Sequence, residues 1–155
     1  MDAESRFIRS QGFTEPAPES CGLHFAALQF QPRIIGVILV AGMILQAIAN
    51  RPSVALFVVL GIVLWWGALL PDANVFEAAY NLTSPRYRLT RAPAPRRFAQ
   101  AIAGSMALAI AAFLYMHWAV AATVVELLLL AAVAAIIFAK FCFGSWLYHK
   151  VFAPR

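Results

Sequence analysis

The sequence predicts an all-α integral membrane protein, a four-helix bundle made of two transmembrane hairpins with both termini on the cytoplasmic side. Three observations predict this class. The chain is 63% hydrophobic and 12% charged, whereas about a quarter of the residues in a soluble domain are charged. It holds four apolar runs, each near the roughly 20 residues that cross a bilayer. Its arginines gather between the second and third of these runs.

The chain begins with a polar segment, residues 1–20, which we expect to be an irregular cytoplasmic N-terminus. Pro16 and Pro18 interrupt it, and it contains no apolar core of the kind that a signal peptide needs. Residues 21–31 then place apolar side chains at helical spacing, but this stretch is too short to span a bilayer. The sequence therefore predicts a separate interfacial segment before the first span.

The first two apolar runs predict a transmembrane hairpin over residues 34–70. Only a short polar turn at residues 50–52 separates them, so the two helices must be antiparallel. The pattern repeats over residues 98–146, where the link between the third and fourth runs is again short and contains His117. We expect a second hairpin there, followed by a cytoplasmic tail over residues 147–155.

The connection between the hairpins, residues 71–97, is basic and is expected to lie in the cytoplasm, because basic loops stay on that side. Its arginines are candidates for contact with anionic lipid or partner proteins: Arg86, Arg88, Arg91, Arg96 and Arg97. The hairpin tips carry only Arg51 and His117, so they are expected to face outside. The net charge of +5 does not indicate nucleic-acid binding, because the arginines lie between apolar runs.

Alanines recur at four-residue intervals in the third and fourth runs, and small side chains let helices approach closely in lipid. The sequence therefore predicts that two alanine stripes form the packing seam of the second hairpin. The stripes are Ala99, Ala103, Ala107 and Ala111 in the third run and Ala131, Ala135 and Ala139 in the fourth. The alternative, that alanine is simply common in membrane spans, stays open.

Glu126 lies inside the fourth apolar run, where an unpaired ionisable group costs about 2.5–3.5 kcal/mol on insertion scales. This cost makes it a candidate functional or cofactor-binding residue. Helical geometry turns it away from the alanine stripe, toward the first or second span, a partner protein, a pigment or a lipid headgroup. The other interpretation is that it reaches the outer interface or is protonated.

His117 is a candidate ligand for a metal or a tetrapyrrole, although an interfacial surface histidine is the simpler interpretation. The sequence contains no phosphate-binding glycine loop, paired carboxylates or nucleophile–histidine pattern. It therefore identifies no cofactor, and it favours a non-catalytic role.

Two short motifs carry a resemblance to a known family. The run PAPRRFAQAIAG at Pro93–Gly104, taken with FCFGSWLY at Phe141–Tyr148, resembles the DUF4395 family of small bacterial membrane proteins. Members have Arg-Phe-Ala-Gln entering the third span and Cys-x-Gly-Cys near the end of the fourth. They also often have a cysteine before the first span, which Cys21 matches.

The chain departs from this family pattern at Ser145, which stands where the resemblance implies a second cysteine after Cys142. A dithiol needs both sulfurs, one to attack and one to resolve the mixed disulfide. Cys142 alone can form a mixed disulfide but cannot close the ring. On the predicted topology Cys21 lies near the same face, so it is a candidate redox partner for Cys142, or a soft-metal ligand together with His24.

These observations favour a non-catalytic accessory subunit of a larger complex, bioenergetic or transport, in the bacterial inner membrane. Its expected partners are membrane lipids and other integral membrane proteins. The alternative is a thiol-dependent membrane protein of sulfur or redox metabolism that uses Cys142 with Cys21. A small transporter is a third hypothesis, although the spans hold little polarity to line a path.

Overall fold

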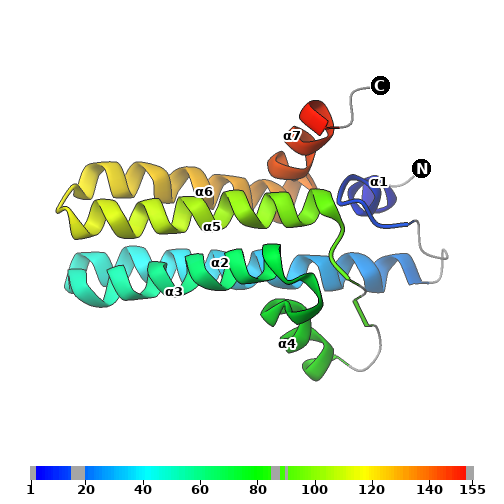
Figure 1. The fold of residues 1–155 in the computed structure, drawn as a ribbon, viewed down its shortest axis with the longest axis horizontal. Coiled ribbons are helices and arrows are strands. Elements are labelled where there is room, and N and C mark those ends of the chain that lie inside the picture. The colour runs from blue at the N-terminus through cyan, green and yellow to red at the C-terminus, as the bar shows by residue number, and fades with distance from the viewer. Residues whose placement is uncertain (1–2, 15–19, 85–87, 90, 153–155) are drawn as a thin grey trace.

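The computed structural model describes residues 3–14, 20–84, 88–89 and 91–152, and these residues form helices and connecting loops without strands. Four helices are long and apolar enough to cross a membrane, which confirms the predicted class and the number of spans. They are α2 (Cys21–Ile48), α3 (Asn50–Leu69), α5 (Ala94–Tyr115) and α6 (Ala119–Ala139). Figure 1 shows α2 and α3 in one layer of the bundle and α5 and α6 in the other.

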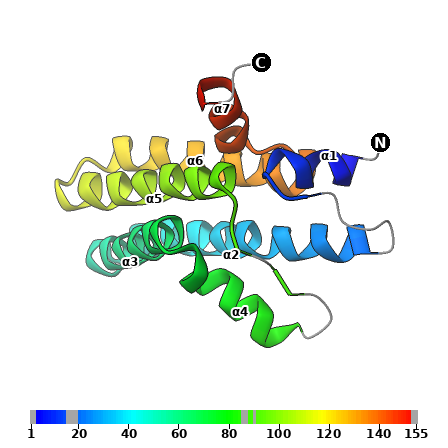
Figure 2. The ribbon, with the colours of Figure 1, turned by 45° about the vertical axis from the view of Figure 1, so that its right-hand side comes forward.

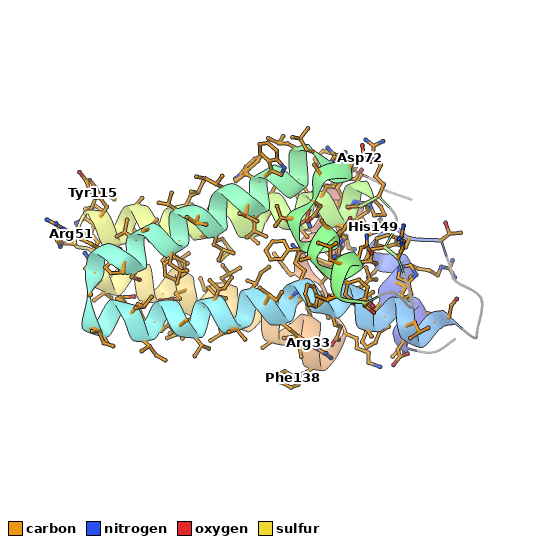
Figure 3. All side chains as sticks on the ribbon, turned by 90° about the horizontal axis from the view of Figure 1, so that it is seen from below. Arg33, Arg51, Asp72, Tyr115, Phe138 and His149 are labelled. Atoms are coloured by element: carbon orange, nitrogen blue, oxygen red, sulfur yellow. The ribbon has the colours of Figure 1, made fainter. Side chains whose placement is uncertain are left out.

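The short helices all lie at one end of the bundle, which we call the terminal end. They are α1 (Ala3–Ser10), the 3-10 turn η2 (Pro71–Ala73), α4 (Val75–Thr83) and α7 (Phe143–Phe152). Figure 2 shows α4 beside the layer of α2 and α3, and α7 beside the layer of α5 and α6. The opposite end, which we call the hairpin end, carries the two tight turns; Figure 3 labels Arg51 and Tyr115 there and Asp72 and His149 at the terminal end.

Local backbone geometry explains the turns at the hairpin end. Ala49 is extended, with φ −153°, and this single residue separates α2 from α3. His117 takes a left-handed conformation, with φ 60°, and ends the turn after α5. The side-chain amide of Asn50 donates to the Leu114 carbonyl at 3.0 Å, so the two hairpin tips are joined by a hydrogen bond across the layers.

The expected boundaries near the N-terminus need correction. Residues 1–20 were expected to be irregular, but Ala3–Ser10 is helical and buries Phe7 and Ile8 against the bundle. Residues 21–31 are not a separate interfacial segment, because α2 runs without interruption from Cys21 through Pro32. Proline is tolerated within membrane helices when neighbouring groups satisfy the freed carbonyl, so it does not mark a boundary here.

The later boundaries shift as well. The basic connection contains α4, and α5 already begins at Ala94. The fourth span ends at Ala139 rather than at residue 146, because Lys140 adopts a left-handed conformation with φ 52°. Its ammonium group lies 3.0 Å from a Glu4 carboxylate oxygen of α1 and over the Phe25 ring. Most of the expected tail is helical as part of α7, and residues 153–155 lie outside the described residues.

The alanine stripe of α6 is not a packing seam, since Ala131 and Ala139 are exposed. The buried face of α6 instead carries Ala122, Glu126, Leu129 and Val133. The extensive contact of α5 is with α3 of the other hairpin. A Cβ atom placed on Gly61 would lie 3.2 Å from the Gly104 carbonyl oxygen, and the reverse holds for Gly104. Two facing glycines, rather than an alanine stripe, thus lie where α3 and α5 approach each other closely.

Candidate functional site: a buried arginine and a thiol on an apolar cavity

Arg96 lies in the first turn of α5 and is 5% exposed. One terminal nitrogen of its guanidinium donates to Gln31 Oε1 of α2 at 3.1 Å. Its Nε lies 3.4 Å from Glu77 Oε1 of α4, an ion pair whose geometry falls short of a hydrogen bond. Arg96 therefore joins three helices at the terminal end, and its charge is balanced inside the protein rather than in water.

Gln31 and Gln100 complete this group, which we call the arginine cluster (Gln31, Glu77, Arg96 and Gln100). An arginine can only donate hydrogen bonds, so Gln31 must turn its oxygen toward Arg96. The same oxygen accepts from Gln100 Nε2 at 2.9 Å. The amide orientation of Gln100 is thereby fixed, and its Oε1 is left buried without a hydrogen-bond partner among the described residues.

Glu77 is placed by the start of α4, where the Asn74 side chain accepts from the Phe76 backbone nitrogen at 3.1 Å. Asn74 itself packs against Gly67 of α3. Burial raises the pKa of the Glu77 carboxyl above its ordinary value of 4.5, while the neighbouring Arg96 acts in the opposite direction. The carboxyl is therefore a titratable partner held in a largely water-free position.

Cys142 stands at the start of α7, where its carbonyl accepts from the Trp146 backbone nitrogen at 3.0 Å. Its sulfur lies 3.4 Å from the Ser145 hydroxyl, which also lies 3.4 Å from the Pro95 carbonyl. The thiol is 6% exposed and is close enough to Arg96 to interact with it electrostatically. Cys142 thus lies at the start of α7 and near the buried guanidinium of Arg96.

The two family motifs meet at this point. A Cβ atom on Gly144 would lie 2.7 Å from Ala99 Cβ, so only glycine lets α7 approach α5 this closely. Phe98 adds ring contacts to Tyr148 and Phe152, each with centroids 5.7 Å apart. The two runs that carry the resemblance thus form one site, in which Arg96, the residue before Arg-Phe-Ala-Gln, lies beside Cys142.

A cavity of about 480 Å³ adjoins this site. Its polar lining residues lie together at the terminal end: Gln11, Gln31, Arg96, Gln100 and Cys142. The rest of the wall is apolar. Most of it comes from α2, α5 and α6, and Phe7 of α1 and the segment 141–144 at the start of α7 complete it. It reaches Leu128, which is 59% exposed, so the cavity opens on the outer surface of the bundle between α5 and α6. Its volume is within the range of small-molecule sites, roughly 300–1,000 Å³.

The alanine stripes contribute to this cavity rather than to a seam. Ala99 and Ala103 of α5 line it from one side, and Ala135 of α6 lines it from the other. Small side chains at these places leave space between the helices that larger ones would fill. Only Ala107 and Ala111 of the predicted stripes are buried in the main apolar core.

The other predicted site residues are not part of the arginine cluster. Cys21 is half-buried with its sulfur 3.7 Å from the Ser5 hydroxyl, and it packs against the apolar cluster that contains Cys142. His117 is exposed at the hairpin end, away from Cys142. Glu126 is fully buried and faces α2, where a Cβ atom on Gly42 would lie 3.2 Å from its Oε1. The described residues hold no group of side chains suited to a metal ion.

The arginines that were predicted to contact lipid or partners differ in their exposure. Arg88 and Arg91 are exposed, and Arg91 lies 3.5 Å from Asp72. Arg97 donates to the Ala68 carbonyl at 2.7 Å. Arg96 was expected to contact lipid or a partner, but its burial in the arginine cluster corrects this expectation. Arg86 lies outside the described residues.

Sequence reasoning missed Gln31, Glu77 and Gln100 as site residues. A signal for the two glutamines was present in the sequence, because Gln31 and Gln100 place amides inside or beside apolar spans. Gln100 is also the last residue of the Arg-Phe-Ala-Gln motif. What the sequence lacks is any indication that residues so far apart along the chain lie together.

The fold and this site define a small four-span α-helical membrane protein with a buried arginine cluster and a thiol on an apolar cavity. A family model, the domain of unknown function DUF4395, matches residues 27–152. The chain belongs to this family, and the matched residues include both motifs of the site. Comparison with curated proteins and with solved structures finds no match.

Proposed function

We propose that this chain is a thiol-dependent membrane protein that uses Cys142 in sulfur or redox metabolism. One observation carries the proposal: Cys142 lines the cavity at its polar end, beside Arg96. A buried thiol with no access route is usually inert. Here a cavity leads to the sulfur, and Arg96 lies next to it.

The corresponding chemistry is thiol–disulfide exchange. The Cys142 sulfur attacks one sulfur of a disulfide substrate, a new S–S bond forms, and the old one breaks. The leaving sulfur takes up the proton that Cys142 gave up, and the substrate disulfide is itself the oxidant, so no other oxidant is needed. The Ser145 hydroxyl is positioned to donate to the Cys142 sulfur at 3.4 Å. A hydroxyl cannot resolve the mixed disulfide, so a second thiol, either Cys21 or one from another molecule, must attack it and restore Cys142.

The accessory-subunit hypothesis is the second candidate. Its support is Ser145, since a hydroxyl occupies the place next to Cys142 where a resolving sulfur would have to lie. In this proposal the four spans pack against a larger bioenergetic or transport complex of the bacterial inner membrane. Cytoplasmic termini are part of both candidates. Their support is the distribution of basic residues, with Arg88, Arg91 and Arg97 at the terminal end and Arg51 at the hairpin end.

A disulfide titration of the purified protein in lipid nanodiscs tests the thiol proposal. The Cys21→Ser protein is exposed to a dipyridyl disulfide, and the released pyridinethione is measured by its absorbance. We expect about one equivalent per chain, and none from the Cys21→Ser/Cys142→Ser protein. Adding Ser145→Cys should release about a second equivalent, because the new sulfur would lie next to the mixed disulfide. Release of no thione by folded Cys21→Ser protein would contradict the proposal.

A second measurement separates the two candidates. The protein is recovered from its native membrane in a gentle detergent, as wild type and as Cys142→Ser. The phenotype of a strain that lacks this protein is compared with that of a strain that carries Cys142→Ser. If both strains show the same defect while membrane insertion and partner recovery of Cys142→Ser are unchanged, the thiol proposal is supported and the accessory proposal fails. If a stoichiometric complex is recovered and the Cys142→Ser strain behaves as wild type, the accessory proposal is supported and the thiol proposal fails.

A further inference from the structure

The cavity offers a site for a ligand whether or not Cys142 reacts. Most of its wall comes from the spanning helices α2, α5 and α6, and it opens sideways between α5 and α6 rather than only toward the terminal end. In a bilayer this opening faces hydrocarbon. The exposed Leu128 on one side and the half-buried Ile102 and Met106 on the other are the residues a ligand would pass.

The apolar wall of the cavity indicates which chemical group can fill most of it. Apart from the polar group at the terminal end, the lining consists of aliphatic and aromatic side chains. Ala103, Ala132 and Ala135 keep the space between α5 and α6 open along the helices. An elongated hydrocarbon chain fits such a space, because burying apolar surface there requires no hydrogen bonds.

The polar end of the cavity indicates which head group the ligand should carry. The charge of Arg96 is already matched by Glu77, so an anionic head is not required. Gln100 is 4% exposed, lines the cavity and has an Oε1 that accepts no hydrogen bond from the described residues. Because Gln31 fixes the amide orientation, this free group is an acceptor and needs a donor. A buried acceptor without a donor is costly, so a hydroxyl head would be favoured there.

We infer that the cavity binds a single-chain membrane amphiphile with a hydroxyl head, which enters between α5 and α6 and donates its hydroxyl hydrogen to Gln100. The ligand lies with its chain along Ala103 and Ala132 and its head next to Cys142. This inference goes beyond the proposed function, because binding needs no reaction at the thiol.

Photo-crosslinking in nanodiscs tests the inference. The probe is a long-chain primary alcohol with a diazirine in its chain, and the matched probe is its methyl ether, which cannot donate. We expect the alcohol to label peptides of α5 and α6 that line the cavity, about five-fold more than the ether does, as one hydrogen bond would allow. Gln100→Leu should remove this preference while labelling of the same peptides continues.

Two neighbouring alanines provide a matched control for the cavity itself. Ala132 lines the cavity, whereas Ala131 is exposed on the lipid-facing surface of α6. Ala132→Trp should abolish the cavity labelling, and Ala131→Trp should leave it unchanged. Unlabelled alcohol should compete with the probe in the wild type, so the result does not depend on the folding of Ala132→Trp.

The results that overturn the inference are distinct from those that overturn the thiol proposal. Equal labelling by alcohol and ether, or equal effects of the two tryptophan variants, would show ordinary lipid contact instead of a site. Alcohol labelling and disulfide exchange are therefore measured separately on the same Cys21→Ser protein. Loss of disulfide exchange with labelling intact would remove only the proposed function, and the reverse result would remove only this inference.

Discussion

The two ends of the bundle bury polar groups in different ways. At the terminal end, Arg96 is buried with Glu77 and two glutamine amides, next to a cavity. At the hairpin end, Glu126 is fully buried, and neither of its oxygens has a hydrogen-bond partner among the described residues. A charge is retained where partners surround it. A carboxylate buried without partners is far more costly than a neutral group of the same shape.

The surroundings of Glu126 support this contrast. Gln46 donates to the Thr123 hydroxyl at 3.2 Å, and Ser53 donates to the Gly42 carbonyl at 3.2 Å. These neutral hydrogen bonds join helices α2, α3 and α6 on either side of the carboxyl. The hairpin end is therefore a closely packed region held by neutral groups, and the terminal end is a charged region with space beside it. The following variants test the difference.

The largest effect is expected from breaking the buried ion pair. Arg96→Met leaves Glu77 buried without its partner, and this should lower the free energy of unfolding by about 3–5 kcal/mol. Arg96→Met combined with Glu77→Leu should recover most of the loss, because no charge is then left alone. Arg88→Met, at an exposed position, is the control. Denaturant titration in detergent measures the differences, and an equal loss from the single and double variants would be contrary to the account.

The next effect concerns the contact of the two motifs. In Gly144→Ala the new Cβ would lie 2.7 Å from Ala99 Cβ and 2.8 Å from its Cα, so α7 must shift. We expect a loss of about 1–3 kcal/mol of stability, as for other overpacked sites. Faster alkylation of Cys142 should accompany it. Gly22→Ala, where the new atom meets nothing within 4 Å, should not destabilise the protein. Equal stability of both alanine variants would argue against close packing of α7 on α5.

A smaller effect is expected at the hairpin end. Glu126→Gln replaces a carboxyl that has no hydrogen-bond partner among the described residues by a neutral group of the same shape, so stability should change by about 1 kcal/mol or less. Glu126→Gln should therefore be much milder than Arg96→Met in the same denaturant titration. A loss as large as that of Arg96→Met would mean that Glu126 is charged and paired with a group not recognised in this account.

The smallest effect is the pH dependence of Glu77. Burial raises its pKa above 4.5, so the folded chain keeps the proton to higher pH than the unfolded chain. The free energy of unfolding should therefore fall as the pH rises from about 4.5 through the folded-state pKa, and level off above it. Glu77→Gln should remove this slope. A slope of the opposite sign in the wild type would show that attraction to Arg96 outweighs burial.

The sequence predicted the membrane class and the number of spans because composition and run length report directly on lipid. It did not predict the arginine cluster, because Gln31, Glu77 and Arg96 lie on separate helices that only folding brings together. Periodicity likewise identified the alanines but not their role. The same small side chains that permit a helix seam also leave a cavity, and the helices that meet closely do so at Gly61 and Gly104.

The most direct test of the central claim is the rate at which a membrane-soluble maleimide alkylates Cys142 in nanodiscs of the Cys21→Ser protein. If the cavity between α5 and α6 is the route to the thiol, Ala132→Trp should slow this reaction by about ten-fold or more, which corresponds to about 1.4 kcal/mol of added barrier. Ala131→Trp should leave the rate unchanged. Equal rates in the two variants would contradict the account, since Cys142 would then be reached without passing through the cavity.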